Sequence, residues 1–201
     1  MAVAGAGFMG VALVAFVLIR TRRDSTLKGL ANQGVFFWFL LSGTVHLVLE
    51  LYYVRNHATL AGDLHPLAQI WKEYSLSDSR YLSSDALVLI LESITTYIWG
   101  PVLFYAAWAL YTDRPTRHVA QLVVSMGHVY SLSIYYLTGL VDGTEYGDPH
   151  PYYFWFYFVF FNVIWMVVPL ALIAQSVKTI VHALSVVQKI NQDKSKSKKK
   201  H

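Results

Sequence analysis

Five long apolar runs constrain the fold of this sequence more than any other feature. A bilayer core about 30 Å thick is crossed by a helix of roughly 20 mostly apolar residues. Charged residues make up only 14% of the chain, against about 25% in soluble proteins. The sequence therefore predicts an all-α fold, an integral membrane bundle of five transmembrane helices, with spans at about 2–19, 34–54, 85–111, 119–141 and 152–177.

The distribution of Lys and Arg predicts the orientation of these spans, because cytoplasmic flanks carry an excess of positive charge. With the N-terminus outside, thirteen Lys and Arg fall on the inner side, and only Arg55, Lys72 and Arg80 fall outside. We therefore expect a lumenal N-terminus and a cytosolic C-terminus. The net charge of +4 comes mainly from the cytosolic flanks, so it does not indicate nucleic-acid binding.

The chain is expected to divide into a membrane domain, residues 1–182, and a basic cytosolic tail, residues 183–201. From Asp193 onward the tail is rich in lysine and is expected to be disordered. It ends in Lys198-Lys199-Lys200-His201, which resembles a dilysine retrieval signal of the endoplasmic reticulum. The sequence thus predicts a multi-pass protein of the endoplasmic-reticulum membrane.

Polar side chains inside the predicted spans are the candidate functional residues, since ionisable groups at membrane depth are costly and mark functional sites. In the third span Glu92, Thr95 and Thr96 share one helical face. In the second span His46 and Glu50 are four residues apart, so we expect the imidazole and the carboxylate to touch.

The depth of these residues predicts that they share a site. At 1.5 Å per residue, His46, Glu92 and Asn162 lie about 14, 10 and 16 Å inward from the lumenal ends of their helices. Two carboxylates and an imidazole can therefore converge in an intramembrane ligand cavity walled by tryptophans. Such a set suits acid–base chemistry, because burial and mutual repulsion favour a proton on one carboxyl group.

Other polar residues are expected to serve the fold. His128 and Gln121 in the fourth span are predicted to be interhelical hydrogen-bond partners. The loop Arg55–Ser84 is predicted to form a structural cap over the bundle rather than to contact a ligand directly, and its mixed charges can pair with one another. A metal site is disfavoured, because the chain has no cysteine and no His-Glu-x-x-His motif.

From about Gly43 to Val177, about two thirds of the chain, several motifs resemble those of the emopamil-binding protein family in the same order and spacing. The first span matches only in character. The motifs are His46-Leu-Val-Leu-Glu50, Trp71-Lys-Glu-Tyr74 with Asp78-Ser-Arg-Tyr81, Glu92-Ser-Ile-Thr95 with Trp99-Gly-Pro101, and Phe154-Trp-Phe-Tyr-Phe-Val-Phe-Phe-Asn162-Val-Ile-Trp165.

The resemblance implies a five-helix enzyme of the endoplasmic reticulum that converts an 8-ene sterol into a 7-ene sterol. It implies that the reaction needs neither an oxidant nor a cofactor. The positions that match the family's functional residues are His46, Glu50 and Glu92 for acid–base catalysis, with Thr95, Asn162, Trp165, Tyr74 and Tyr81 for substrate binding.

The implied mechanism protonates one alkene carbon, passes through a carbocation and removes an allylic proton. Either a carboxylic acid or the His46 imidazolium donates to carbon 9, and a carboxylate takes the proton from carbon 7. We favour Glu92 as the base, with His46 and Glu50 as a coupled donor pair. Trp165 would face the carbocation, which a tryptophan can stabilise by roughly 2 kcal/mol, and cationic amphiphilic amines that mimic the cation are expected to bind as inhibitors.

One departure from the isomerase pattern leaves alternatives open. His128-Val-Tyr130-Ser131 stands where the isomerases usually have Gln-x-Tyr-Gly, which adds an ionisable group near the expected pocket. A non-catalytic sterol and amine-binding protein of the same fold is therefore an alternative, as is a scaffold in which Glu50 and Glu92 are paired and inaccessible. Membrane lipid is an expected partner in each case, and the sequence is also compatible with a homodimer.

Overall fold

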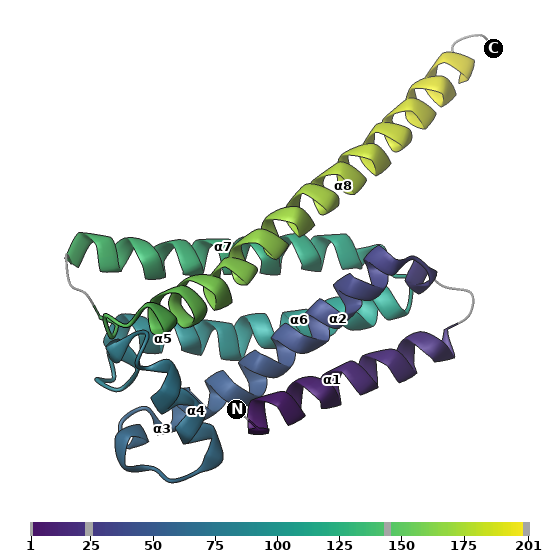
Figure 1. Ribbon diagram of the computed structural model, residues 1–201. Helices are drawn as coiled ribbons and strands as arrows, with labels where there is room; N and C mark the ends of the chain where they lie inside the picture. Colours follow the sequence, from purple (N-terminus) through teal and green to yellow (C-terminus); the bar gives the residue numbers. More distant parts are fainter. Residues whose placement is uncertain (1, 23–25, 143–145, 199–201) are drawn as a thin grey trace.

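The computed structural model describes residues 2–22, 26–142 and 146–198 of the chain, and within these ranges it contains helices and loops but no strand. The long helical segments run back and forth beside one another (Figure 1). They are α1 (Ala2–Thr21), then α2 (Leu30–Thr44), η2 (Val45–Glu50) and α3 (Leu51–Asn56) in series, then α5 (Ala86–Ile94), η5 (Thr95–Trp99) and α6 (Gly100–Tyr111) in series, then α7 (Thr116–Asp142), and finally η6 (Tyr153–Phe161) with α8 (Asn162–Lys198).

The two ends of the bundle differ. One end, called the cap end below, carries the loop between α3 and α5 with the short helices η3 (Leu60–Gly62), α4 (Pro66–Tyr74) and η4 (Ser79–Tyr81). The opposite end, called the tail end, carries η1 (Thr26–Lys28) and the turn between α6 and α7, and α8 extends past it (Figure 1).

The segments η2, η5 and η6 are π-helices, in which backbone hydrogen bonds span five residues instead of four. The sequence predicted plain α-helices there, because apolar spacing does not distinguish a π-turn within a longer helix. Such turns are frequent at functional sites, and here two of them carry candidate residues: η2 contains His46 and Glu50, and η5 begins at Thr95.

Two apolar clusters hold the bundle together. At the tail end, α2, α6 and α7 pack through side chains such as Phe39, Leu103 and Ala106, all fully buried. At the cap end, the packing is aromatic, with Tyr53, Trp71 and Tyr81 in mutual ring contact. The cap loop therefore packs on the helices as a folded lid over this end, as the sequence predicted.

The membrane prediction is confirmed in its coarse form. Among the described residues, three helical stretches are long and apolar enough to cross a membrane: Leu30–Asn56, Ala86–Tyr111 and Tyr153–Lys198. The stretch Gly5–Thr21 is apolar but shorter, and α7 is long but richer in polar side chains. These helices define a membrane protein.

The expected disorder of the tail is not what the structure shows. Helix α8 continues without interruption to Lys198, and its residues beyond Val181 are exposed on every side. The physical reason is local, since no glycine or proline follows Pro169 and the tail consists largely of residues that tolerate or favour helix. Lys199, Lys200 and His201, part of the predicted retrieval signal, lie outside the described residues.

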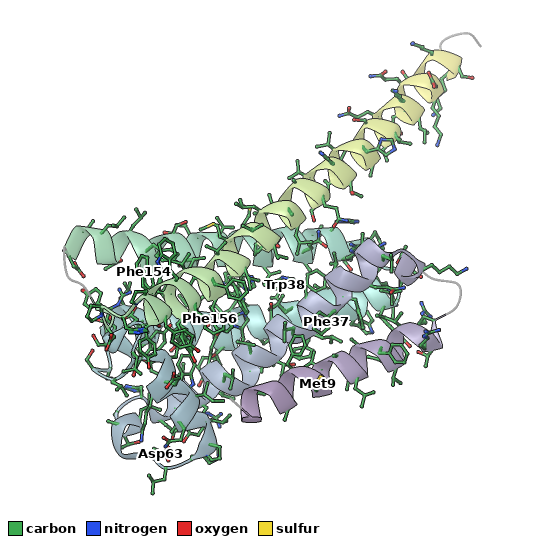
Figure 2. The ribbon with its side chains drawn as sticks, in the orientation of Figure 1. Met9, Phe37, Trp38, Asp63, Phe154 and Phe156 are labelled. Carbon is green, nitrogen blue, oxygen red and sulfur yellow. The ribbon has the colours of Figure 1, made fainter. Side chains whose placement is uncertain are left out.

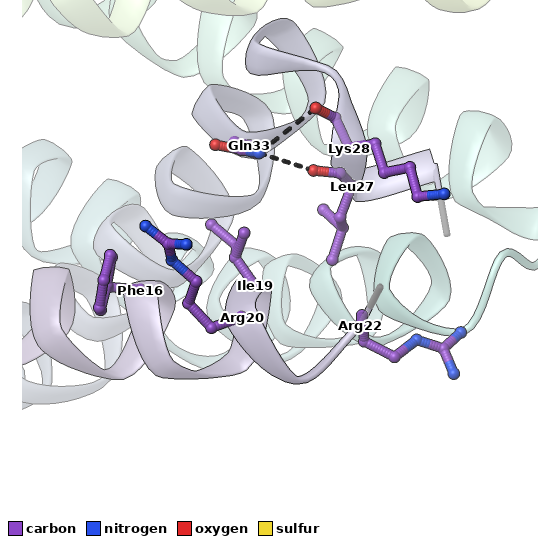
Figure 3. Close-up of a pocket in the computed structure, with 7 residues that line it drawn as sticks. All are labelled: Phe16, Ile19, Arg20, Arg22, Leu27, Lys28 and Gln33. Atoms are coloured by element: carbon purple, nitrogen blue, oxygen red, sulfur yellow. Dashed lines mark hydrogen bonds between the residues drawn. The ribbon is translucent and has the colours of Figure 1, made fainter. Parts of the chain in front are cut away.

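The loops of the tail end are tied to each other. The backbone N–H of Thr26 donates to Asp113 Oδ1 at 3.1 Å, and the Thr26 hydroxyl donates to the same oxygen. These bonds hold the pKa of Asp113 below its usual value. A groove of about 640 Å³ lies beside these loops (Figure 3), and three of its lining residues are cationic. The lining residues are Phe16, Ile19, Arg20, Arg22, Leu27, Lys28 and Gln33. Arg23, which the sequence assigned to the same flank, lies outside the described residues.

Candidate active site

The predicted contact between His46 and Glu50 is confirmed. His46 Nδ1 lies 2.6 Å from Glu50 Oε1, and the two residues are 2% and 8% exposed. A charge-assisted hydrogen bond between such groups is short and strong. Both residues belong to η2, so the pair is held by one rigid turn near the middle of a long helical segment.

Thr95 joins this pair to the second carboxyl group. The Thr95 hydroxyl donates to Glu50 Oε2, and it also lies 2.9 Å from the backbone oxygen of Glu92. Thr95 therefore contacts both the carboxylate of Glu50 and the backbone of Glu92. The structure therefore brings together His46, Glu50, Glu92 and Thr95, four of the residues singled out in the sequence.

Two glycines allow these segments to approach so closely. A Cβ atom on Gly100 would lie 3.0 Å from the Leu47 side chain, and one on Gly127 would lie 2.5 Å from the Trp99 indole. Only a residue without a side chain fits at the second position. The Thr96 hydroxyl, which donates to the backbone oxygen of His46 at 3.2 Å, adds a polar link between η5 and η2.

Glu92 has one satisfied oxygen and one open one. Its Oε1 accepts a hydrogen bond from the Tyr81 hydroxyl at 2.7 Å, whereas Oε2 is buried without a partner among the described residues. Burial raises the pKa of Tyr81 well above its usual value, so Tyr81 stays a hydrogen-bond donor to Glu92. This buried oxygen is therefore the atom of the Glu92 carboxyl group that still lacks a hydrogen-bond partner among the described residues.

The cap loop supplies both tyrosines that were predicted to bind substrate. Tyr81 contacts Glu92, and Tyr74 accepts a hydrogen bond from the side chain of Asn162 at 3.2 Å. Burial also raises the pKa of Tyr74. The Asn162 amide donates in addition to the backbone oxygen of Phe158 at 2.7 Å, which fixes its orientation. In this structure the two tyrosines therefore support site residues.

A buried ion pair within the cap loop is bound to Tyr135 of α7. Arg80 binds Asp78 with a shortest distance of 2.6 Å, which confirms the predicted pairing of loop charges. The Tyr135 hydroxyl donates to Asp78, and the Arg80 guanidinium lies 4.6 Å from the centroid of the Tyr135 ring. This anchor holds the Tyr81 end of the loop in place.

Trp165 lies between the two apolar clusters and packs against both. Its ring centroid is 5.1 Å from that of Trp38 (labelled in Figure 2), where α2 passes α8. Phe154 and Trp155, in the aromatic run of η6, are exposed. Exposed aromatic rings of this kind are typical of helix surfaces that face a membrane interface.

His128 was predicted to serve the fold alone, but it contacts a candidate catalytic residue. Its Nε2 lies 3.0 Å from Nε2 of His46, and His128 is only 4% exposed. It is an interhelical hydrogen-bond partner, as predicted, but the partner is a candidate catalytic residue. Gln121, by contrast, donates to Leu172 and Gln175 on α8, away from the carboxyl groups, which confirms the structural interpretation.

The described residues contain no group of three or more His, Asp or Glu side chains arranged to hold a metal ion. The polar atoms of the cluster instead contact one another across η2, η5 and α7. The arrangement can hold and transfer protons, because the Glu50 carboxyl group and the His46 imidazole share a hydrogen bond and Thr95 connects Glu50 to the backbone of Glu92.

The fold and this set define the class of the molecule, an all-helical membrane protein with a cluster of buried polar side chains between its helices. Residues 66–176 match the family model described as EXPERA (EXPanded EBP superfamily). The chain therefore belongs to this family, the one that the motifs resembled.

The chain is similar to individual members of the family over most of their length. The 3-beta-hydroxysteroid-Delta(8),Delta(7)-isomerase of Rattus norvegicus is 39% identical over 94% of this chain and 83% of the relative. The mouse protein of the same name is 39% identical over 89% and 79%. Isomeliandiol synthase MOI2 of Melia azedarach is 35% identical over 71% and 67%.

Proposed function

We infer that this protein is a sterol isomerase that moves the B-ring double bond of an 8-ene sterol to the 7 position. The isomerase relatives cover about nine tenths of the chain, and the reaction in their names needs an acid and a base at one site. The observation that carries the inference is the buried contact of Glu50 with His46 beside the second carboxyl group, Glu92.

We propose that the Glu50–His46 pair donates and that Glu92 accepts the proton. The donor places a proton on carbon 9, using the electron pair of the Δ8 double bond, and leaves a carbocation at carbon 8. Glu92 then takes a proton from carbon 7, and the electron pair of that C–H bond becomes the Δ7 double bond. The free Oε2 of Glu92 supports this assignment, because it is the carboxylate oxygen without a partner among the described residues.

The remaining candidates assist this transfer. Tyr81 orients the Glu92 carboxyl group by its hydrogen bond, and Thr95 orients Glu50. Asn162 and Tyr74 form a second polar pair next to them. Trp165 supplies an aromatic face that stabilises the carbocation, and the nearby carboxylates add to this electrostatically. The same features would bind cationic amphiphilic amines.

The surroundings of the site follow from the apolar helices. We propose that five segments cross the endoplasmic-reticulum membrane, that the sterol occupies an intramembrane cavity at the cap end, and that the cap end is lumenal. The charge asymmetry supports this orientation. Residues 1–182 would form the membrane domain surrounded by lipid, and residues 183–201 a cytosolic tail with a retrieval signal. A homodimer is compatible with this arrangement.

Conversion of an 8-ene sterol by purified protein tests the function. Gas chromatography and mass spectrometry of the products should show a 7-ene sterol at a rate proportional to the protein added. Unchanged sterol together with saturable binding of a cationic amine would instead identify a non-catalytic binding protein of the same fold.

A further inference from the structure

The site contains a buried histidine that the proposed mechanism does not use. The ring centroids of His128 and His46 are 5.1 Å apart, and the ring planes are inclined by 61°. The rings are thus not stacked, and the two Nε2 atoms meet at 3.0 Å. Because His128 lies on α7 and His46 on η2, this contact extends the polar set of η2 to another helix.

Counting protons shows that this contact is more than packing. An N···N hydrogen bond needs one proton between the two nitrogens, since two bare nitrogens or two N–H groups repel each other. If Glu50 is ionised, His46 Nδ1 carries a proton. If His46 is neutral, its Nε2 accepts a hydrogen bond from His128; if His46 is an imidazolium, its Nε2 donates to His128. If Glu50 is protonated, its hydroxyl donates to Nδ1 of a neutral His46, and His46 Nε2 donates to His128.

Glu50, His46 and His128 therefore form one continuous path along which a proton can shift without movement of any heavy atom. The path ends at His128, because its Nδ1 is buried without a partner among the described residues. Two imidazolium ions at this distance would repel each other, so at most one of the two rings carries a positive charge at a time.

The other charged and polar groups of this region are as follows. Among the described residues, the carboxyl groups are Glu50 on η2, Glu92 on α5 and Asp78 of the cap loop, which is paired with Arg80, and the phenols are Tyr74 and Tyr81 of the cap loop and Tyr135 on α7. The polar groups from η5 and α8 are neutral. They are the hydroxyls of Thr95 and Thr96 and the amide of Asn162.

We propose that His128 is a positioning residue of the isomerase reaction that acts through His46. It sets the proton on His46 Nε2 and supplies a second place for the proton that restores the donor after each turnover. One turnover forms a C–H bond at carbon 9 and breaks one at carbon 7, so the donor must regain a proton while Glu92 loses one. The proposal rests on the isomerase function inferred above.

Two substitutions separate this role from packing. His128→Gln keeps a donor and an acceptor but does not titrate, whereas His128→Leu removes the hydrogen bond. His118→Gln is the matched control, a half-buried histidine in the first turn of α7. The measurement is kcat and KM for conversion of an 8-ene sterol between pH 5 and 9, normalised to correctly folded protein.

In H128Q we expect kcat near pH 7 to fall about three- to tenfold, KM to stay within about twofold, and one limb of the pH profile to move by at least about half a unit. In H128L we expect kcat to fall about 10- to 100-fold. The H118Q profile should superimpose on that of the unsubstituted protein. If H128L does not fold, H128Q alone decides.

A pH profile of H128Q identical to that of the unsubstituted protein, or a change in KM alone, would overturn the proposal. An equal change in H118Q would also contradict it. If the unsubstituted protein forms no 7-ene sterol, the isomerase function itself fails, and the role of His128 fails with it. The two failures are distinguished by the activity of the unsubstituted protein.

Discussion

The tail end and the cap end of the bundle differ in the residue types that pack there. At the tail end, regular α-helices pack through aliphatic side chains, alanines and the rings of Phe36, Trp38 and Phe39, and the polar link of Gln121 joins α7 to α8. At the cap end, π-helical turns interrupt the helices, and histidine, carboxyl, hydroxyl and tyrosine groups are buried together. One half of the molecule thus provides packing, and the other half carries costly groups suited to chemistry.

Removing a carboxyl group at the cap end should have the largest effect on activity. We expect Glu92→Gln and Glu50→Gln each to lower kcat by roughly a thousandfold or more, because the amide can neither accept nor deliver the transferred proton. The measurement is single-turnover conversion of an 8-ene sterol. Asp148→Asn is the control, an exposed carboxylate of the loop after α7, and should leave kcat unchanged. Near-normal activity in either glutamine variant would remove that residue from the mechanism.

A glycine at the contact of η5 and α7 should be the next most sensitive position. Gly127→Ala would place a methyl group 2.5 Å from the Trp99 indole, and overpacking of this kind costs about 1–3 kcal/mol. We expect a lower thermal midpoint and a lower kcat, since the same contact sets the distance of His128 from His46. Gly139→Ala, where the added atom meets only Tyr146 at 4.0 Å, should be neutral or stabilising.

A polar link at the tail end should matter for stability alone. Gln121→Leu removes hydrogen bonds of 3.0 Å to the backbone oxygen of Leu172 and 2.9 Å to the Gln175 side chain. Interhelical bonds of this kind contribute about 0.6 to 1.7 kcal/mol in membranes. We expect a small loss in the free energy of unfolding at unchanged kcat. A large drop in kcat with no loss of stability would contradict the division between the two ends.

The smallest expected effect is that of Asp113→Asn on the stability of the tail-end loops at acid pH. Because the pKa of Asp113 is lowered in the folded protein, its contribution to stability is present above the unfolded pKa of about 3.9 and is lost as the pH falls through the lower folded value. Asp113→Asn should therefore flatten the decline of the thermal midpoint below about pH 4. The change should amount to a few tenths of a kcal/mol, because the residue is exposed.

Much of the candidate site could be predicted from the spacing of residues along single helices. The i to i+4 pair His46–Glu50 touches as expected, and the face shared by Glu92, Thr95 and Thr96 meets it. These features could be predicted because both the spacing along one helix and the depth in the membrane follow from residue numbers.

The parts that escaped prediction depend on contacts between distant segments. The link from His128 to His46 requires the close approach at Gly127, and the Tyr81 bond to Glu92 requires a folded cap loop. The π-turns cannot be recognised from the spacing of apolar residues. Gly127, next to His128, was a sequence signal for the contact between His128 and His46.

Isomerisation in heavy water tests the central claim, proton transfer at the cap end, most directly. The product of an 8-ene sterol should be a 7-ene sterol with one deuterium at carbon 9, located by mass spectrometry and NMR, because the donor exchanges its proton with solvent between turnovers. A 7-ene product without deuterium, or deuterium at carbon 9 formed equally fast by the Glu50→Gln and Glu92→Gln variants, would contradict the account.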